Sequence, residues 1–423
     1  MNIKTVHRGW LILFLSVLTG LACLGLGRFS YGAILPFMKA GLNLNYIETG
    51  WVTSSIFLGY VLCAFFAGYF VNKFSAKKVI IFFLWVIFLG MIATSLSTGF
   101  ISAYLSSFFI GIGSGGANVA SMGVVSSWFS PRKRGMALGI LNAGNGLGIV
   151  FSGVAVPMIV NSSIGSGWRI SWVLLAILVL AISILNIFFL KSHPSDIGDL
   201  PVGNSNESLN KNASPKLITS SLYSVYKNPM VWTIGICYFL WGFSYIMFTT
   251  FLVDFLIDFG LSSLLAGRIF AIAGFISIIS GFLWGSISDR LGRLTSLSLV
   301  FFLQMLFLLG FSFSANSSGL MALAILYSIT LWGTPAIILA STAEFVNQTQ
   351  VSSAIGFLTL FFGIGQLVGP IIIGYILNLT SSYSHAFVLS ALSCFSGSLI
   401  SLMLHHYLKK AKLHTAQHIK SGA

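Results

Sequence analysis

The sequence predicts an all-α membrane protein with twelve transmembrane helices in two six-helix, pseudo-symmetric halves. Three observations predict this fold class. The 423 residues are 56% apolar and only 7% charged, whereas soluble proteins carry about 25% charged residues. Twelve apolar runs are each long enough to cross the hydrocarbon layer, which takes about 20 residues of helix. Features of the first six runs also recur in the last six.

The twelve runs follow one another through short polar connections, apart from one long break. The predicted spans are Trp10–Met38, Glu48–Val71, Val79–Leu96, Ile101–Trp128, Gly135–Val160, Trp168–Leu190, Met230–Phe255, Leu264–Ile287, Leu294–Phe313, Leu320–Ala343, Ala354–Leu379 and Ala386–Tyr407. The first run is too long for a signal peptide and is expected to remain as a span.

The break between the sixth and seventh spans is rich in Pro, Ser and Asn and is predicted to be a cytoplasmic linker. The predicted domains are an N-terminal half over 1–190, the linker over 191–228, a C-terminal half over 229–408 and a basic tail over 409–423. We expect the tail to be mobile.

The basic residues gather in the connections on one side of this predicted array. All but four of the 22 Lys and Arg residues do so, and the exceptions are Arg28, Lys39, Arg169 and Arg268. Basic loops favour the cytoplasm, so we expect a multi-pass protein of the cell (inner) membrane with both termini cytoplasmic. The net charge of +14 then reflects topology, and the expected surroundings are a lipid bilayer without a nucleic-acid partner.

An internal repeat relates the two halves of the chain. Matching residues of the two halves are as far apart in the sequence as Gly50 is from Gly267. These glycines begin the second and eighth spans. The loop after the second span carries a degenerate copy of the loop after the eighth span at the same offset. A loop motif and glycines at one offset indicate two copies of a six-helix unit. The loop residues concerned are Gly68, Asn72 and Lys73 in the first copy and Gly285, Asp289, Arg290, Gly292 and Arg293 in the second.

The Gly-x-x-x-Asp-Arg-x-Gly-Arg loop at 285–293 resembles the signature of the major facilitator superfamily. The resemblance covers the whole chain, including the twelve spans, the linker and both repeats. Segment 128–148 is similar to the fifth-span motif of monocarboxylate and oxalate/formate-type porters, and the Pro194–Gly203 motif recurs in those bacterial relatives. Segment 25–38 resembles the first span of a group of bacterial permeases. The resemblance implies a substrate site near the midplane between the halves.

The resemblance places the 285–293 loop at the cytoplasmic seam, where its charges are predicted to act as a gate. Asp289 would pair with Arg290 or Arg293, and Glu344 with Arg293. The alternative is that these charges only mark topology. Asn72 replaces the acid in the first half, so we expect the gate to be weaker there. The predicted gating residues are Gly68, Asn72, Lys73, Gly285, Asp289, Arg290, Gly292, Arg293 and Glu344.

Arg28 is predicted to bind the substrate. It lies deep in the first span, where a charge costs about 2.5–3.5 kcal/mol and usually marks function. A guanidinium there could hold an anion through two parallel hydrogen bonds. The alternative is an ion pair or hydrogen bonds between helices. The predicted substrate-binding residues are Arg28, Tyr31, Asn118, Asn142, Asn145, Trp241, Tyr245 and Gln366, with Trp332 as a further candidate.

Three charged residues at the predicted external ends of the seventh and eighth spans are candidates for proton coupling. They are Asp254, Asp258 and Arg268. We expect Arg268 to pair with Asp254 or Asp258 across the external mouth. The alternative is that one of the two acids carries the coupling proton.

Together these features predict a secondary active transporter that moves a small organic anion, such as a monocarboxylate, by alternating access. We expect a monomer coupled by symport or antiport to a proton or another ion. The absence of a phosphate-binding loop or a metal-ligand motif predicts no enzymatic activity, no cofactor and no metal. One alternative is a multidrug or metabolite efflux permease in which Arg28 is structural. A polytopic receptor or membrane enzyme would not need repeated gating loops. The resemblance places the span-1 Lys of animal monocarboxylate porters at Leu35 and the span-8 Arg of the relatives near Gly281, and the absence of both argues against lactate-like transport.

Overall fold

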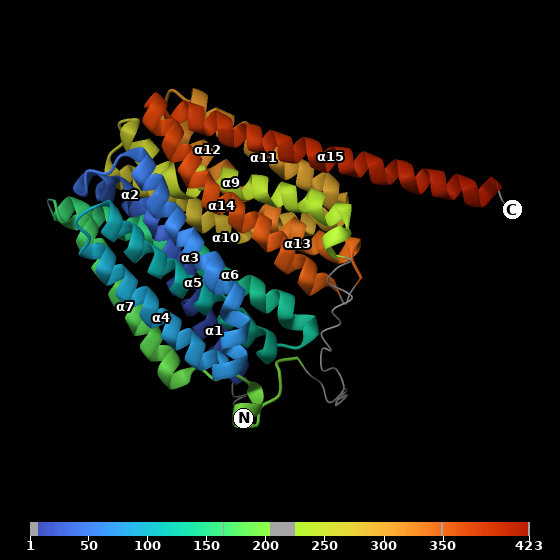
Figure 1. Cartoon of the computed structure of the whole chain (residues 1–423), viewed down its shortest axis with the longest axis horizontal. Helices are drawn as coiled ribbons and strands as arrows, with labels where there is room; N and C mark the ends of the chain where they lie inside the picture. The colour runs from blue at the N-terminus through green and yellow to red at the C-terminus, as the bar shows by residue number, and fades with distance from the viewer. Residues whose placement is uncertain (1–6, 164, 204–224, 348–349, 422–423) are drawn as a thin grey trace, which may run out of the picture. The chain divides into compact units, whose positions relative to one another are not determined.

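The computed structural model describes residues 7–163, 165–203, 225–347 and 350–421 (Figure 1). Within these residues, twelve spans are long and apolar enough to cross a membrane, which confirms the predicted number. The N-terminal helices are α1 (Arg8–Gly20), η1 (Leu21–Phe29), α2 (Ser30–Gly41), α3 (Tyr46–Phe74), α4 (Ala76–Ser95), α5 (Phe100–Trp128), α6 (Pro131–Ser162), α7 (Gly167–Phe189) and η2 (Pro194–Ile197). The C-terminal helices are α9 (Pro229–Asp258), α10 (Ser263–Leu291), α11 (Arg293–Phe313), α12 (Ser317–Thr330), α13 (Gly333–Phe345), α14 (Val351–Thr380) and α15 (Tyr383–Ser421).

The first span is not one regular helix, because the π-helical segment η1 separates α1 from α2. Two glycines of η1 allow close packing on neighbouring helices. A Cβ atom on Gly25 would lie 2.8 Å from Gly148 Cα of α6, and one on Gly27 would lie 2.9 Å from Ser114 Oγ of α5. Segments of π-helix are rare in proteins, and those that occur are often found at functional sites. Arg28 lies near the end of this segment.

The tenth span is broken between α12 and α13, which the hydropathy pattern does not reveal. Pro335 lacks an N–H and its ring disfavours a regular helix over the preceding turn. Two carbonyl groups near the break accept hydrogen bonds from side chains of other helices. Trp284 Nε1 donates to the Ile329 carbonyl at 3.0 Å, and Gln304 Nε2 donates to the Thr330 carbonyl at 3.0 Å. Side chains of other helices therefore satisfy these two carbonyls next to the break.

The internal repeat is also present in the backbone conformation. Ser75 precedes α4 with φ of 74°, and Gly292, its counterpart at the repeat offset, precedes α11 with φ of 89°. Their ψ angles of 147° and 146° complete the correspondence. This region of backbone space is almost restricted to glycine. Ser75 therefore carries backbone strain that its repeat partner avoids.

The described part of the linker is packed against the junction of α5 and α6. Val202 forms an isolated parallel β-bridge with Phe129. The Val202 N–H donates to the Trp128 carbonyl at 2.8 Å, and its carbonyl accepts from the Ser130 N–H at 3.1 Å. Trp128 Nε1 also donates to the Lys191 carbonyl at 3.1 Å. The Pro194–Gly203 motif thus has a structural role, while linker residues 204–224 lie outside the described residues.

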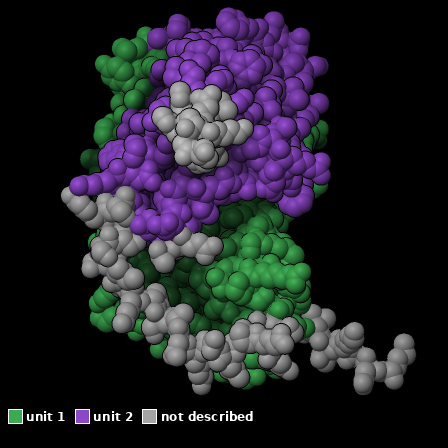
Figure 2. All heavy atoms as spheres, turned by 90° about the vertical axis from the view of Figure 1, so that its right-hand side faces the viewer, with its two compact units in different colours: residues 1–216, 248–278, 370–379 green, residues 217–247, 279–369, 380–423 purple. Residues whose placement is uncertain are grey.

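The basic tail continues α15 as helix to Ser421, and its expected mobility stays a prediction. The chain forms two compact units (Figure 2). Unit 1 contains residues 1–216, 248–278 and 370–379, and unit 2 contains residues 217–247, 279–369 and 380–423. Unit 1 therefore combines the N-terminal helices with one end of each of α9, α10 and α14. The predicted domain boundaries, which follow the repeat, stay a prediction.

Within unit 1, two helix pairs meet at contacts that the repeat relates. Gly50 of α3 lies against the Pro370 backbone of α14, and Gly267 of α10 lies against the Gly153 backbone of α6. The offset that separates Gly50 from Gly267 also separates Gly153 from Pro370. Small residues let helix backbones approach closely inside a membrane. The repeat is therefore a property of the packing as well as of the sequence.

Candidate functional site

Arg28 lies in unit 1 and is only 6% exposed. Its guanidinium carbon is 4.4 Å from the ring centroid of Phe57 and 5.1 Å from that of Tyr60, both on α3. Aromatic faces attract a guanidinium, so these two rings help to hold the Arg28 side chain in place. Sequence reasoning missed Phe57 and Tyr60. Their spacing of three residues places them on one helix face, which was the available signal.

Asn118 of α5 extends this site through Tyr60. Its Nδ2 donates to the Tyr60 hydroxyl at 2.9 Å. The Asn118 Oδ1 atom is buried and accepts no hydrogen bond from the described residues. Asn145 of α6, beside Gly20, has a buried Oδ1 atom in the same condition. A buried acceptor gains free energy when a ligand supplies a donor, so these amides suit a hydroxyl-bearing molecule.

Two other predicted substrate residues in unit 1 have different surroundings. The Tyr31 ring is buried, with its centroid 6.4 Å from that of Trp172 on α7. Asn142 lies exposed on α6. The contacts therefore define an Arg28 group consisting of Arg28, Phe57, Tyr60 and Asn118.

The predicted residues in unit 2 form an aromatic cluster. The rings of Trp241 and Tyr245 are stacked with centroids 4.6 Å apart, and Trp332 lies 6.0 Å from Trp241 in an edge-to-face arrangement. Gln366 Nε2 donates a hydrogen bond to the Tyr245 hydroxyl. Phe362 stacks on Trp241 from α14, with centroids 5.1 Å apart. The structure thus gathers four candidates from three spans into one cluster, in which Trp241, Tyr245 and Gln366 are buried.

The predicted pairing of Arg268 with Asp254 or Asp258 is wrong. Asp254 of α9 pairs instead with Lys39 of α2, and the Lys39 Nζ lies 2.8 and 3.0 Å from the two carboxylate oxygens. The Asp254 and Lys39 side chains are 5% and 19% exposed. The Lys39 ammonium also lies 4.0 Å from the Tyr46 ring centroid. Asp258 and Arg268 are both exposed. Lys39 could have been found as a cation left over at the same predicted end as Asp254.

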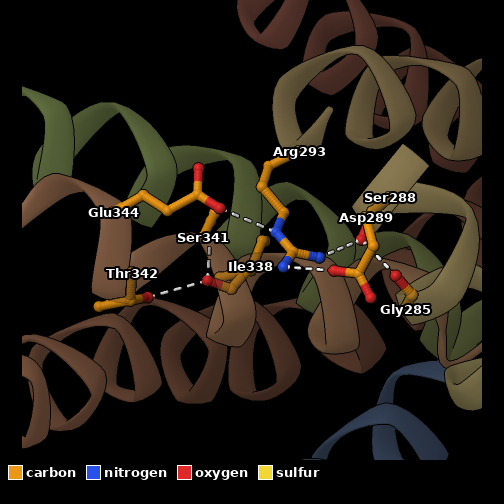
Figure 3. Close-up of polar contacts among 8 residues, drawn as sticks. All are labelled: Gly285, Ser288, Asp289, Arg293, Ile338, Ser341, Thr342 and Glu344. Atoms are coloured by element: carbon orange, nitrogen blue, oxygen red, sulfur yellow. Dashed lines mark hydrogen bonds and ion pairs between the residues drawn. The ribbon is translucent and has the colours of Figure 1, made fainter. Parts of the chain in front are cut away.

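The predicted contacts of Arg293 with Asp289 and Glu344 are present in unit 2 (Figure 3). Arg293 Nη2 lies 2.5 Å from Asp289, and Nε lies 3.1 Å from Glu344. Arg293 Nη1 also donates to the Ser288 hydroxyl at 2.5 Å. The two acids are 63% and 55% exposed, so each ion pair contributes about 0–1 kcal/mol. Arg290, the other predicted partner of Asp289, is exposed. One guanidinium thus connects α10, α11 and α13.

The corresponding loop of the first half has no such network. Gly68 and Asn72 are exposed, and the Lys73 ammonium lies 5.7 Å from the Tyr69 ring centroid. Where the structure describes the chain, the ion pairs do not include Asn72 or Lys73. Since an amide replaces the acid, this loop lacks the negative partner that Asp289 supplies in the second half.

The comparisons with known proteins point to transport. A family model described as "Major Facilitator Superfamily" matches residues 17–343. The chain is 28% identical to the hexuronate transporter of Bacillus subtilis over 86% of this chain and 87% of that protein. It is 22% identical to a probable sulfoacetate transporter of Cupriavidus necator over 90% of each chain. It is 24% identical to monocarboxylate transporter 4 of Rattus norvegicus over 93% of this chain and 82% of that protein.

Solved transporter structures share the fold. An inward-facing, unoccupied bacterial homologue of the human lysosomal transporter Spinster has a TM-score of 0.73 at 14% identity, covering 95% of this chain and 96% of that chain. The nucleoside transporter NupG has a TM-score of 0.73 at 15% identity, covering 93% of this chain and 99% of that chain. At these identities the likeness concerns the fold alone.

Proposed function

The chain belongs to the major facilitator superfamily, and from this we propose that it moves a small organic anion across the membrane by alternating access. It is a multi-pass membrane transporter and not an enzyme. Three relatives are named for hexuronate, sulfoacetate and monocarboxylates, and all of these are carboxylate or sulfonate anions. The substrate class proposed here is therefore an organic acid, with hexuronates as the first compounds to test.

The burial of Arg28 carries this proposal. A guanidinium that is 6% exposed in a membrane-spanning segment costs free energy, and a residue kept there despite this cost by default marks a functional site. The faces of Phe57 and Tyr60 hold it in place, and its planar fork of donors matches a carboxylate. The amide of Asn118 offers an acceptor for a hydroxyl group of a sugar acid. This combination favours a hydroxylated carboxylate over a cationic drug.

We assign the coupling role to Asp254 together with Lys39. Their buried ion pair joins α2 to α9 within unit 1. Protonation of Asp254 would remove the negative charge that holds the Lys39 ammonium and so weaken the junction. Asp258 is exposed, so its protonation would not weaken a junction between helices in this way. The coupling ion in this proposal is a proton.

Gating is assigned to the ends of the helices. In unit 2 the Arg293 network ties α10, α11 and α13 together at the predicted cytoplasmic seam. In unit 1 the glycine contacts of α3 with α14 and of α6 with α10 lie near the predicted external ends of these helices, and we assign gating to them there. We assign both termini to the cytoplasm on the distribution of basic residues, and we take the transporter to be a monomer.

Uptake of radiolabelled hexuronate into proteoliposomes with an imposed proton gradient tests the proposal. Arg28→Gln should abolish uptake because it removes the only charge of the Arg28 group. Arg28→Lys should keep partial uptake, since an ammonium retains the charge but loses the planar fork. Arg132→Gln, which removes an exposed arginine of α6, is the matched control. Melting temperatures of the purified variants check folding. Full uptake by a folded Arg28→Gln protein would refute the proposed role of Arg28 in substrate binding.

A further inference from the structure

We propose that a groove between α6 and α10 binds the phosphate headgroup of an anionic phospholipid. The groove lies entirely within unit 1 and has a volume of about 570 Å³. Its lining comes from the last turns of α6, including Met158, Asn161 and Ser162, and from Leu264 and Arg268 near the start of α10. This site is separate from the Arg28 group and does not depend on which solute is transported.

The charge of the groove favours an anion. Arg268 is exposed and lies five residues inside α10, about 7.5 Å along the helix axis. This depth suits a side chain that reaches the headgroup layer of a bilayer. Over the described ranges, the carboxylates that form ion pairs are Asp254, Asp289 and Glu344. Their partners are Lys39 and Arg293, and not Arg268. A guanidinium recognises phosphate through two parallel hydrogen bonds.

Polar and apolar groups are arranged in the groove as a phospholipid needs them. Ser263 Oγ donates to Asn161 Oδ1 at 2.9 Å, which links the two helices at their ends. This bond leaves the amide N–H groups of Asn161 as donors for a headgroup oxygen. Further along the helices, Val154 and Met158 are 46% and 59% exposed. Their apolar side chains supply a surface for the acyl chains.

A second groove provides an internal contrast. It has a volume of about 480 Å³ and is lined by residues of α3 and α5, including Glu48, Trp51 and Tyr104. Glu48 is the charged residue of this lining, and it also accepts a hydrogen bond from the Asn45 N–H in a capping box at the start of α3. A carboxylate repels a phosphate headgroup. The two grooves therefore differ in the sign of their charge, and only the Arg268 groove suits an anionic lipid.

Because the groove lies beside the α6–α10 contact, lipid binding in it should affect the stability of that contact. Gly267, next to Arg268, lies against Gly153 at the α6–α10 contact. A headgroup that binds Arg268 and Asn161 together would bridge both helices. Because a ligand stabilises the state it binds, an anionic lipid should stabilise this helix contact.

Thermal unfolding of the purified full-length protein in detergent tests the site. Dioleoyl phosphatidylglycerol should raise the melting temperature, while dioleoyl phosphatidylcholine and inorganic phosphate should not. Arg268→Gln should weaken the apparent affinity for phosphatidylglycerol about tenfold, the loss expected for a charge-assisted contact. Arg268→Lys should weaken it less. Arg132→Gln removes an exposed arginine from the opposite end of α6 and should leave the response unchanged.

Three results would overturn the inference. An equal loss in Arg268→Gln and Arg132→Gln would mean that the lipid responds to overall charge rather than to the groove. An unchanged response in Arg268→Gln would remove Arg268 from lipid binding. Stabilisation by inorganic phosphate alone would identify a site for free anions. Each readout is a melting temperature, so a failure of the proposed transport function leaves this test intact.

Discussion

The four basic residues outside the topology-marking loops have four different surroundings. Arg28 is stacked on aromatic rings, and Lys39 is paired with Asp254. Arg169 Nη1 donates to the Ser95 carbonyl at 2.6 Å, which caps the end of α4. Arg268 lines the groove between α6 and α10. In a chain that is 7% charged, the partner of each charge decides its role.

Replacing the partners of the Lys39–Asp254 pair singly and together should reveal their coupling. Asp254→Asn leaves the Lys39 ammonium, whose side chain is 19% exposed, without its counter-charge and should cost about 2 kcal/mol of stability. Lys39→Gln should cost a similar amount. The double variant should recover part of the loss, because it buries no unpaired charge. Melting temperatures of the four proteins measure this cycle.

The same variants address coupling. Asp254→Asn should retain exchange of substrate across the membrane while losing accumulation driven by a proton gradient, because the asparagine cannot carry the proton. Additive losses of stability would contradict the ion pair, and gradient-driven accumulation by Asp254→Asn would contradict the coupling role.

At the scale of elements, two spans depart from regular helix for different reasons. The first contains η1, whose glycines pack on α5 and α6. The tenth is interrupted at Leu331 and Trp332, shortly before Pro335, whose missing N–H removes a hydrogen bond to the preceding turn. Proline is visible in a sequence, but it does not mark a break by itself, because Pro36, Pro157 and Pro370 lie inside helices. A π-helical segment has no comparable signature, since it follows from contacts with neighbouring helices.

The repeat-related positions before α4 and α11 should respond in opposite ways to substitution. Ser75→Gly should stabilise the protein by about 1 kcal/mol, because glycine adopts the positive φ without strain. Gly292→Ala should destabilise it by about 1–3 kcal/mol for the converse reason. Thermal or denaturant unfolding measures both changes. A destabilising Ser75→Gly would show that the serine side chain contributes more than the strain it imposes.

At the scale of the whole molecule, the glycine contacts of unit 1 should be sensitive to a single methyl group. Gly50→Ala and Gly267→Ala each place a Cβ against another helix backbone, and overpacking of this kind costs about 1–3 kcal/mol. Gly68→Ala in α3 and Gly285→Ala in α10 are matched controls, because a Cβ at either position meets no atom within 4 Å. Melting temperatures compare the two sets. Equal effects would contradict the contacts.

Much of the architecture could be predicted from the sequence. Hydropathy identified the twelve spans, and a constant offset between matching residues identified the repeat that Ser75 and Gly292 display in their backbone angles. The contact of Arg293 with Asp289 was also predictable, because Asp289 lies four residues away in the same loop motif. Each of these features depends on local composition or on spacing along the chain.

The candidate site was only partly predictable. Arg28 was conspicuous as a charge inside an apolar run, but its aromatic partners Phe57 and Tyr60 were not. Asp254 was recognised, yet its partner is Lys39 and not Arg268. The sequence by itself determined which residues form the membrane-spanning segments and which few charged residues lie within or beside them. Only the tertiary structure decided which side chains meet, because that depends on how each helix is rotated about its axis and on the depth at which its neighbours pack.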